Sequence, residues 1–188
     1  MTIRTCLCLL TRPTPAAGSP AAGAAAPAPG AGADGAQVLL GFKKTGFGAG
    51  RWVGLGGHIE DGEQPADAAV REVAEESGLI VSASALTHMA RLSFVFPARP
   101  AWDQTAEVFV ATDFAGEAAE SDELIPRWFG VGSLPLAGMW DDARYWLPLV
   151  LAGETVTADI TFADDCATVA AIDPDLPAPA PALGAHPA

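Results

Sequence analysis

The 188-residue chain has few basic residues and no apolar run long enough to cross a membrane. It contains 10 Lys and Arg against 23 Asp and Glu, which gives a net charge of -13. Sequence-independent affinity for nucleic acid comes from Lys and Arg contacts to phosphates, so this deficit argues against a nucleic-acid binder. The apolar run from Cys6 to Leu10 is too short for a signal-peptide core or a membrane span, so we expect no membrane partner.

Cysteine is also scarce. Cys6, Cys8 and Cys166 make an odd number and lack the spacing of a zinc site. Cys6 and Cys8 alternate along an expected strand and therefore share one of its faces, which is typical of small core residues. These features indicate reduced thiols in a cytoplasmic protein.

Large apolar residues are almost absent from two stretches, at about 13–37 and at 174–188, which are rich in Ala and Pro. Such segments cannot offset the entropy lost on ordering, so we expect both to be disordered. One domain, 1–173, then remains, interrupted by the first stretch. Loop-closure entropy grows only logarithmically with loop length, so the strands on either side of that loop can still pair.

Two helices are expected between strand-like segments. Pro65 suits the first turn of a helix and Gly78 its left-handed end, and the intervening apolar residues recur at helical spacing. A second helix is expected to begin near Asp141 and to continue over 143–151, with Pro148 as an interior kink point. The expected core-facing stripe of the first helix comprises Ala66, Ala69, Val70, Val73 and Ala74.

Segments rich in β-forming residues, or with alternating apolar residues, predict strands on both sides of the first helix. Mixed strands with one early and one late helix indicate an α/β sandwich with a mixed sheet. The expected strands are 5–10, 37–43, 51–53, 86–96, 107–113, 126–131, 158–162 and 168–172.

Three glutamates are expected to lie close together on the first helix. Glu72 and Glu76 are four residues apart and share a face, and Glu75 borders it. Clustered carboxylates need cations, and hard oxygen ligands suit Mg²⁺ or Mn²⁺, which leave positions for water and substrate phosphates. The pattern predicts a metal-bound phosphate ester, although the same glutamates by themselves are also typical of a solvated helix face.

The stretch from Gly57 to Leu79 resembles the Nudix box, whose pattern is Gly, five residues, Glu, seven residues, Arg-Glu-apolar-any-Glu-Glu-any-Gly-apolar. The resemblance implies a Nudix-type α/β/α sandwich with a mixed sheet, and a hydrolase that cleaves nucleoside diphosphates linked to another group. It also implies that Arg71 and Glu63 orient each other and take no part in the chemistry. The fixed positions of the box are Gly57, Glu63, Arg71, Glu72, Glu75, Glu76 and Gly78.

Tracts outside the box are similar to the oxidised purine nucleoside triphosphatases, the 8-oxo-dGTP diphosphatases. These tracts are 38–44, 46–52, 120–123, 128–129, 139–140 and 145–149. The resemblance implies a Mg²⁺-dependent enzyme, with Mn²⁺ as the other candidate ion, that converts oxidised purine (d)NTPs to monophosphate and pyrophosphate. Its partner would be a free nucleoside triphosphate, and we expect a monomer.

The same resemblance implies roles for individual residues. The implied metal ligands are the Gly56 carbonyl and the carboxylates of Glu72, Glu75, Glu76 and Glu123. Three of these, Glu75, Glu76 and Glu123, are also the catalytic candidates. Glu76 or Glu123 would activate water. Base binding falls to two stacking residues, Phe47 and Trp140, and to Phe94, Phe96, Trp146, Thr5 and Asp142. Lys43 is the candidate cation for the substrate, with Lys44, Arg51 and Arg91 as further cations near the expected site.

Two positions depart from the family pattern. Val53 replaces an Asn that binds the purine edge, and Ala143 replaces one of two adjacent base-reading acids, while Asp142 retains the other. Losing two such polar contacts predicts an altered base preference. Two alternatives stay open: a Nudix pyrophosphatase for another nucleoside diphosphate-linked substrate, and a non-catalytic nucleotide-binding module. None of the box carboxylates is missing, which disfavours the latter.

Overall fold

The computed structural model describes residues 2–15, 35–174 and 176. The predicted disorder of the two Ala- and Pro-rich stretches falls mostly on residues outside these ranges. At the edges of the first stretch, β1 (Ile3–Pro13) and β2 (Ala36–Lys43) pair antiparallel, from Thr11 opposite Val38 to Pro13 opposite Ala36. The expected pairing of the two strands across the insertion is confirmed.

The strands of the described residues form an eight-stranded mixed sheet. Its order is β3-β2-β1-β5-β4-β7-β8, and β6 pairs with β2. β1 runs parallel to β5, and β4 runs parallel to β7. All the predicted strands are present. The remaining bounds are β3 Trp52–Val53, β4 Thr87–Val95, β5 Gln104–Ala111, β6 Leu124–Gly130, β7 Val156–Phe162 and β8 Val169–Asp173.

β5 and β6 both begin earlier than predicted, because neighbouring strands extend their ladders. Gln104 pairs with Ile3 of β1 and with Phe94 of β4. Leu124 pairs with Lys43 at the end of β2. Tertiary pairing therefore decides these strand starts, which the local sequence does not mark.

The first helix, α1 (Pro65–Ser77), has the predicted ends. Gly78 lies in the left-handed region with φ 72°, and its N–H donates to the Ala74 carbonyl at 2.9 Å. The predicted core-facing stripe is wrong at Ala74, which is exposed, whereas Glu76 is buried. The helix packs against β1 through the face that contains Val73 and Glu76, and Ala74 lies on the outer side.

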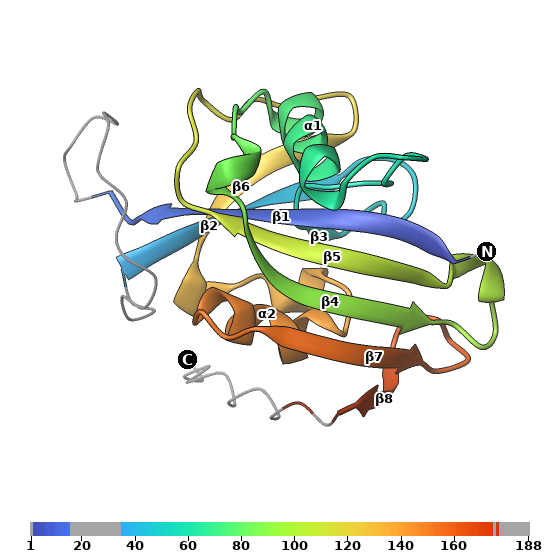
Figure 1. Cartoon of the computed structure of the whole chain (residues 1–188). Coiled ribbons are helices and arrows are strands. Elements are labelled where there is room, and N and C mark those ends of the chain that lie inside the picture. The colour runs from blue at the N-terminus through green and yellow to red at the C-terminus, as the bar shows by residue number, and fades with distance from the viewer. Residues whose placement is uncertain (1, 16–34, 175, 177–188) are drawn as a thin grey trace, which may run out of the picture.

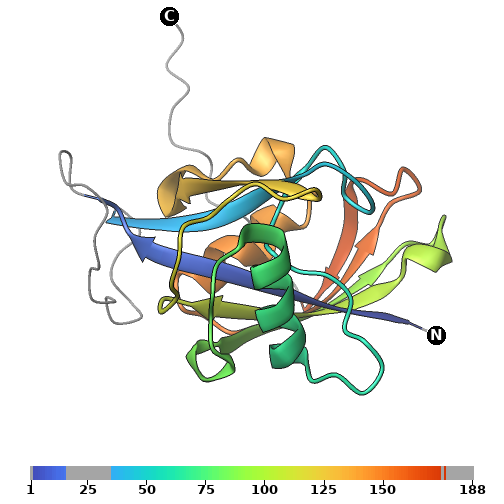
Figure 2. The ribbon, with the colours of Figure 1, turned by 90° about the horizontal axis from the view of Figure 1, so that it is seen from above.

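The second helix, α2 (Ala143–Leu151), includes Pro148 and lies on the other side of the sheet from α1 (Figure 1). Viewed from above, α1 lies across β1 (Figure 2). Short 3₁₀ helices complete the connections, at Ala83–Ala85, Pro100–Trp102, Val131–Ser133 and Leu136–Gly138. Among the described residues, no helix combines the length and apolarity that crossing a membrane requires.

Alternation along β1 divides the core between the two helices. Cys6, Cys8 and Leu10 belong to the cluster beneath α1, whereas Leu7 and Leu9 belong to the cluster beneath α2. All three cysteines are buried free thiols, and burial raises the pKa of Cys8 to about 12. The predicted α/β/α sandwich with a mixed sheet is confirmed, and Thr5, Leu7 and Leu9 face the α2 side, where the site lies.

Candidate functional site

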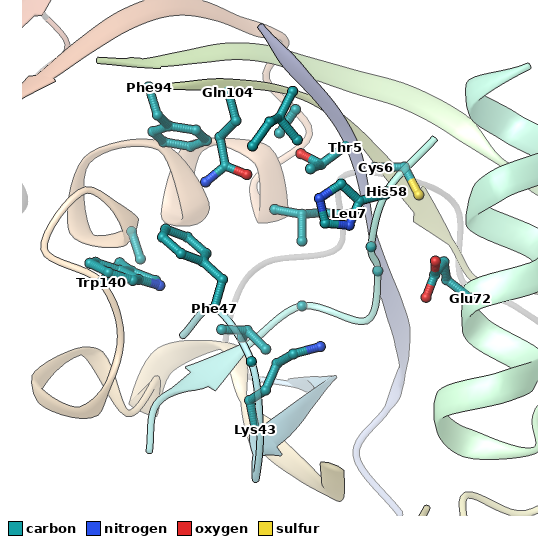
Figure 3. Close-up of a pocket in the computed structure, with 18 of the residues that line it drawn as sticks. Thr5, Cys6, Leu7, Lys43, Phe47, His58, Glu72, Phe94, Gln104 and Trp140 are labelled. Atoms are coloured by element: carbon teal, nitrogen blue, oxygen red, sulfur yellow. The ribbon is translucent and has the colours of Figure 1, made fainter. Parts of the chain in front are cut away.

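A pocket of about 720 Å³ is lined by residues of β1 and α2 and, at its other end, by Glu72 and Glu75 of α1 (Figure 3). This volume lies within the range of roughly 300–1,000 Å³ that is usual for small-molecule sites. Its two ends differ chemically. The aromatic end is lined by Phe47, Phe94, Phe96, Trp102, Trp140 and Trp146, and the acidic end by Glu72, Glu75 and Glu123. Such a pocket suits a ligand with a flat apolar group at one end and a charged group at the other.

Glu76 is a buried carboxylate behind the acidic end, with a side chain that is 3% exposed. One of its oxygens accepts from the Gly56 N–H at 2.8 Å, and the other accepts from Lys43 Nζ at 3.1 Å. Burial raises the pKa of Glu76, although Lys43 and the Gly56 N–H act in the opposite direction. Lys43 also contacts Glu123 at 3.3 Å, so one ammonium joins two carboxylates that are far apart in the sequence.

Arg71 connects the loop of the box to its helix. Its Nε and Nη2 donate to the two oxygens of Glu63, each at 3.0 Å, and this pairing lowers the pKa of Glu63. Its Nη1 donates to Glu72 at 2.7 Å and to Glu75 at 3.3 Å, and Nη2 also reaches the His58 carbonyl. This bidentate geometry is the one expected of an orienting pair.

Two glycines allow the loop to approach these carboxylates closely. A Cβ on Gly57 would lie 2.5 Å from a carboxylate oxygen of Glu72. A Cβ on Gly56 would lie 2.1 Å from the Cys6 carbonyl oxygen, which is backbone and cannot move aside. A side chain at Gly56 therefore displaces the loop from β1, whereas one at Gly57 displaces the Glu72 carboxylate.

The prediction that Glu72, Glu75 and Glu76 lie close together holds for the first two, whose carboxylates both accept from Arg71 Nη1. Glu76 turns toward Gly56, and Glu75 is 62% exposed and contacts Arg71. Within residues 2–15, 35–174 and 176, no three acidic, His or Cys side chains gather closely enough to form a metal cluster. The donor chemistry still fits a hard divalent ion, because carboxylate oxygens line one end of the pocket beside the Gly56 backbone.

At the aromatic end, Phe47 stacks directly on Trp140, with ring centroids 5.1 Å apart and planes 17° apart. A base sandwiched between two rings needs about 7 Å between them, twice the ordinary contact distance of about 3.5 Å. Phe47 therefore covers the face of Trp140 that a base would use. Phe96 stacks on Phe162, with ring centroids 4.4 Å apart.

Asp142 is the buried acid of the aromatic end and immediately precedes α2. Its Oδ2 accepts from Trp146 Nε1 at 2.7 Å. Burial raises the pKa of Asp142 to about 6, against the opposing effect of the Trp146 hydrogen bond. Asp141 does not line the pocket. Its carboxylate accepts from the Val169 N–H at 2.9 Å and pairs with Arg144.

The other predicted pocket residues are also accounted for. Thr5 lines the pocket and its hydroxyl donates to the Thr105 carbonyl at 3.0 Å. Lys43 lines the pocket, whereas the other candidate cations, Lys44, Arg51 and Arg91, do not. The two positions that depart from the family pattern, Val53 and Ala143, both line it.

Sequence reasoning missed Trp102, Gln104 and Phe162, which also line the pocket. A signal for Gln104 existed, since it alternates with Ala106 and Val108 on the core face of β5. The predicted strand began at Glu107 and so left Gln104 out. Trp102 lies in a 3₁₀ turn, and only the tertiary structure brings it to the pocket.

Comparisons with known proteins agree with this geometry. The NUDIX domain model matches residues 23–150. The chain is 41% identical over 128 residues to the oxidized purine nucleoside triphosphate hydrolase of Mus musculus, covering 68% of this chain and 80% of that protein. It is 44% identical over 115 residues to the protein of the same name from Danio rerio, covering 61% of this chain and 72% of that protein.

Solved structures show the same fold. The mutator MutT protein from Bacillus halodurans superposes with a TM-score of 0.66 at 22% identity, covering 92% of this chain and 99% of that one. A second match is a bifunctional NMN adenylyltransferase/ADP ribose pyrophosphatase from Francisella tularensis, complexed with AMP and a manganese ion. It superposes with a TM-score of 0.55 at 18% identity, covering 81% of this chain and 42% of that one. From its domain match and its relatives, this chain belongs to the Nudix family of hydrolases.

Proposed function

We propose that this chain is a Mg²⁺-dependent pyrophosphohydrolase that converts oxidised purine (d)NTPs, such as 8-oxo-dGTP, to the monophosphate and pyrophosphate. The observation that carries this proposal is a single pocket with stacking aromatics at one end and the carboxylates of the box at the other. The names of the mouse and zebrafish relatives support the same substrate class. The net charge of -13 supports a free nucleotide, bound locally, over a nucleic acid.

The acidic end would bind the metal and the phosphates. We assign the ligands to the Gly56 carbonyl and to the carboxylates of Glu72, Glu75, Glu76 and Glu123. Bound Mg²⁺ supplies neutralisation of the phosphate charge and lowers the pKa of the attacking water. We assign to Lys43, whose ammonium contacts Glu76 and Glu123, an ion pair with a phosphate oxygen of the substrate.

Hydrolysis at this end needs a proton acceptor but no covalent nucleophile. Water adds to one of the two phosphorus atoms that flank the bond between the α- and β-phosphoryl groups, that P–O bond breaks, and the products are the monophosphate and pyrophosphate. We assign proton acceptance to Glu76 or Glu123, with Glu75 beside them. Arg71, held by both oxygens of Glu63, orients Glu72 and Glu75 and stays outside the chemistry.

The aromatic end would bind the base. A base that stacks on Trp140 replaces Phe47, so the bound state exchanges one aromatic contact for another. Stacking contributes about 1–3 kcal/mol whatever the base, and it therefore provides affinity without choice. We assign a share of that choice to Asp142, whose buried carboxyl lines this end and is fixed by Trp146.

A second candidate is a Nudix pyrophosphatase with a different base preference. The hydrocarbon side chains of Val53 and Ala143 in the pocket favour it, because neither can hydrogen-bond a purine edge. A panel of oxidised and unmodified nucleoside triphosphates, a capped nucleotide and nucleotide sugars, each with Mg²⁺, separates the two. Hydrolysis fastest for oxidised purine triphosphates, measured as pyrophosphate, supports the first candidate. Faster hydrolysis of another substrate selects the second; it is measured as pyrophosphate for triphosphates and as phosphorylated nucleoside products for the capped nucleotide and the nucleotide sugars.

The same panel tests catalysis itself. Binding of nucleotides without release of pyrophosphate or orthophosphate would instead indicate a non-catalytic module. We further propose that the enzyme is a cytoplasmic monomer. Light scattering of the purified chain at micromolar concentration tests its oligomeric state.

A further inference from the structure

Gln104 contributes a polar side chain to the aromatic end of the pocket. Three side chains there carry hydrogen-bonding groups aimed at the cavity: Thr5, Gln104 and Asp142. The Thr5 hydroxyl donates to the Thr105 carbonyl, and Asp142 accepts from Trp146. The carboxamide of Gln104 makes no hydrogen bond to any part of the chain that the structure describes. Both its donor and its acceptor are therefore available to a ligand.

The sheet positions Gln104 rigidly. It is the first residue of β5, and it pairs with Ile3 of β1 on one side and with Phe94 of β4 on the other. The preceding Asp103 accepts from the Phe96 N–H at 2.7 Å and fixes the connection between the two strands. Figure 3 shows the Gln104 side chain pointing into the cavity beside Phe94 and near Thr5.

The composition of the surrounding wall leaves few other groups to read a base. Val53 and Ala143 line the same pocket and offer only hydrocarbon. Most of the remaining lining at this end is aromatic, and it stacks on any base equally. Of the three polar side chains, Thr5 uses its donor on the Thr105 carbonyl, so Gln104 and Asp142 are the side chains best able to distinguish one purine edge from another.

We propose that Gln104 is a specificity-determining residue, whose carboxamide binds a purine edge with a donor beside an acceptor and so selects oxidised guanine over guanine. Oxidation at C8 converts N7 from an acceptor to an N–H donor, while O6 stays an acceptor. The carboxamide then pairs with both groups, through its carbonyl and its N–H. Unmodified guanine presents two acceptors on this edge, so only one contact forms. This inference rests on the proposed function and adds the residue that supplies its selectivity.

The test compares kcat/KM for 8-oxo-dGTP and dGTP in the whole chain and in Gln104→Met, which keeps the length of the side chain but removes both hydrogen-bonding groups. One bidentate contact predicts that the preference for 8-oxo-dGTP falls about ten- to hundred-fold in the variant. The kcat/KM for dGTP should fall less, by about two- to ten-fold, because guanine loses only its single contact. Gln37→Met is the matched control, because Gln37 lies in β2, pairs with Arg12 and is not a pocket residue. It should leave both substrates unaffected.

Two further variants make every outcome decisive. Gln104→Glu keeps the size and the acceptor for N7–H but removes the donor to O6, so it should lower kcat/KM for both nucleotides while the preference for 8-oxo-dGTP persists, and Gln104→Asn should retain part of both contacts. Affinity for the product monophosphates, measured by calorimetry without turnover, should show the same pattern. An unchanged preference in Gln104→Met, or loss of the preference in Gln104→Glu, overturns the role of Gln104. A wild-type chain that cleaves neither nucleotide would instead refute the proposed function.

Discussion

The raised pKa of Asp142 predicts a specific dependence of stability on pH. Burial raises this pKa from 3.8 to about 6, so the folded chain binds the Asp142 proton more tightly than the unfolded chain does. The resulting stability is fully present below the unfolded pKa and is lost as the pH rises through about 6. The shift corresponds to about 3 kcal/mol, of which about 1 kcal/mol is lost between pH 5 and pH 8.

Asp142→Asn removes this titration and keeps an oxygen to accept from Trp146 Nε1. We expect the free energy of unfolding of the variant, relative to wild type, to rise by about 1 kcal/mol from pH 5 to pH 8. Urea unfolding at four pH values measures it, and pH 5 stays above the pI near 4.3. The exposed Asp113→Asn is the matched control. A difference that stays constant across this range would refute a buried, proton-binding Asp142.

The same variant tests the assigned role in catalysis. Protonation changes Asp142 from an acceptor to a donor, so selectivity among purines should change near pH 6 in wild type. In Asp142→Asn that change should disappear. Normal turnover with unaltered selectivity among bases would show that Asp142 does not read the base.

Other expectations follow from the acidic and aromatic ends. Glu76→Gln should lower the rate of pyrophosphate release by roughly 10²–10⁴ while circular dichroism stays unchanged; an unaffected rate would overturn the metal assignment. Gly57→Ala places a Cβ 2.5 Å from the Glu72 carboxylate and should weaken Mg²⁺ binding, measured by calorimetry, about ten- to hundred-fold. Gly35→Ala is the control and should leave Mg²⁺ binding unchanged, because a Cβ on Gly35 would have no neighbouring atom within 4 Å. Trp140→Ala should raise KM roughly ten- to hundred-fold for oxidised and unmodified purines alike, and a selective effect would contradict simple stacking.

Much of the scaffold was predictable because its signals are local. Pro65 and Gly78 bound a helix by their backbone preferences, and the alternation at Cys6 and Cys8 assigns a strand face without knowledge of its partner. Where the neighbours decide, prediction failed. Ala74 is exposed because β1 selects another face of α1, and β5 begins at Gln104 because the adjacent strands extend to it.

The features of the site also divide into those set by local sequence and those set by tertiary contacts. Spacing alone placed the box glutamates on one helix beside a glycine loop, since four residues make about one helical turn. It did not reveal that Lys43 links Glu76 to Glu123, that Phe47 covers Trp140, or that Gln104 points into the pocket. These contacts join segments far apart in the chain, and their geometry depends on how the sheet brings its strands together. The sequence by itself determined the chemical family, and the packing of β1, β4 and β5 against α2 decided which groups line the aromatic end of the pocket.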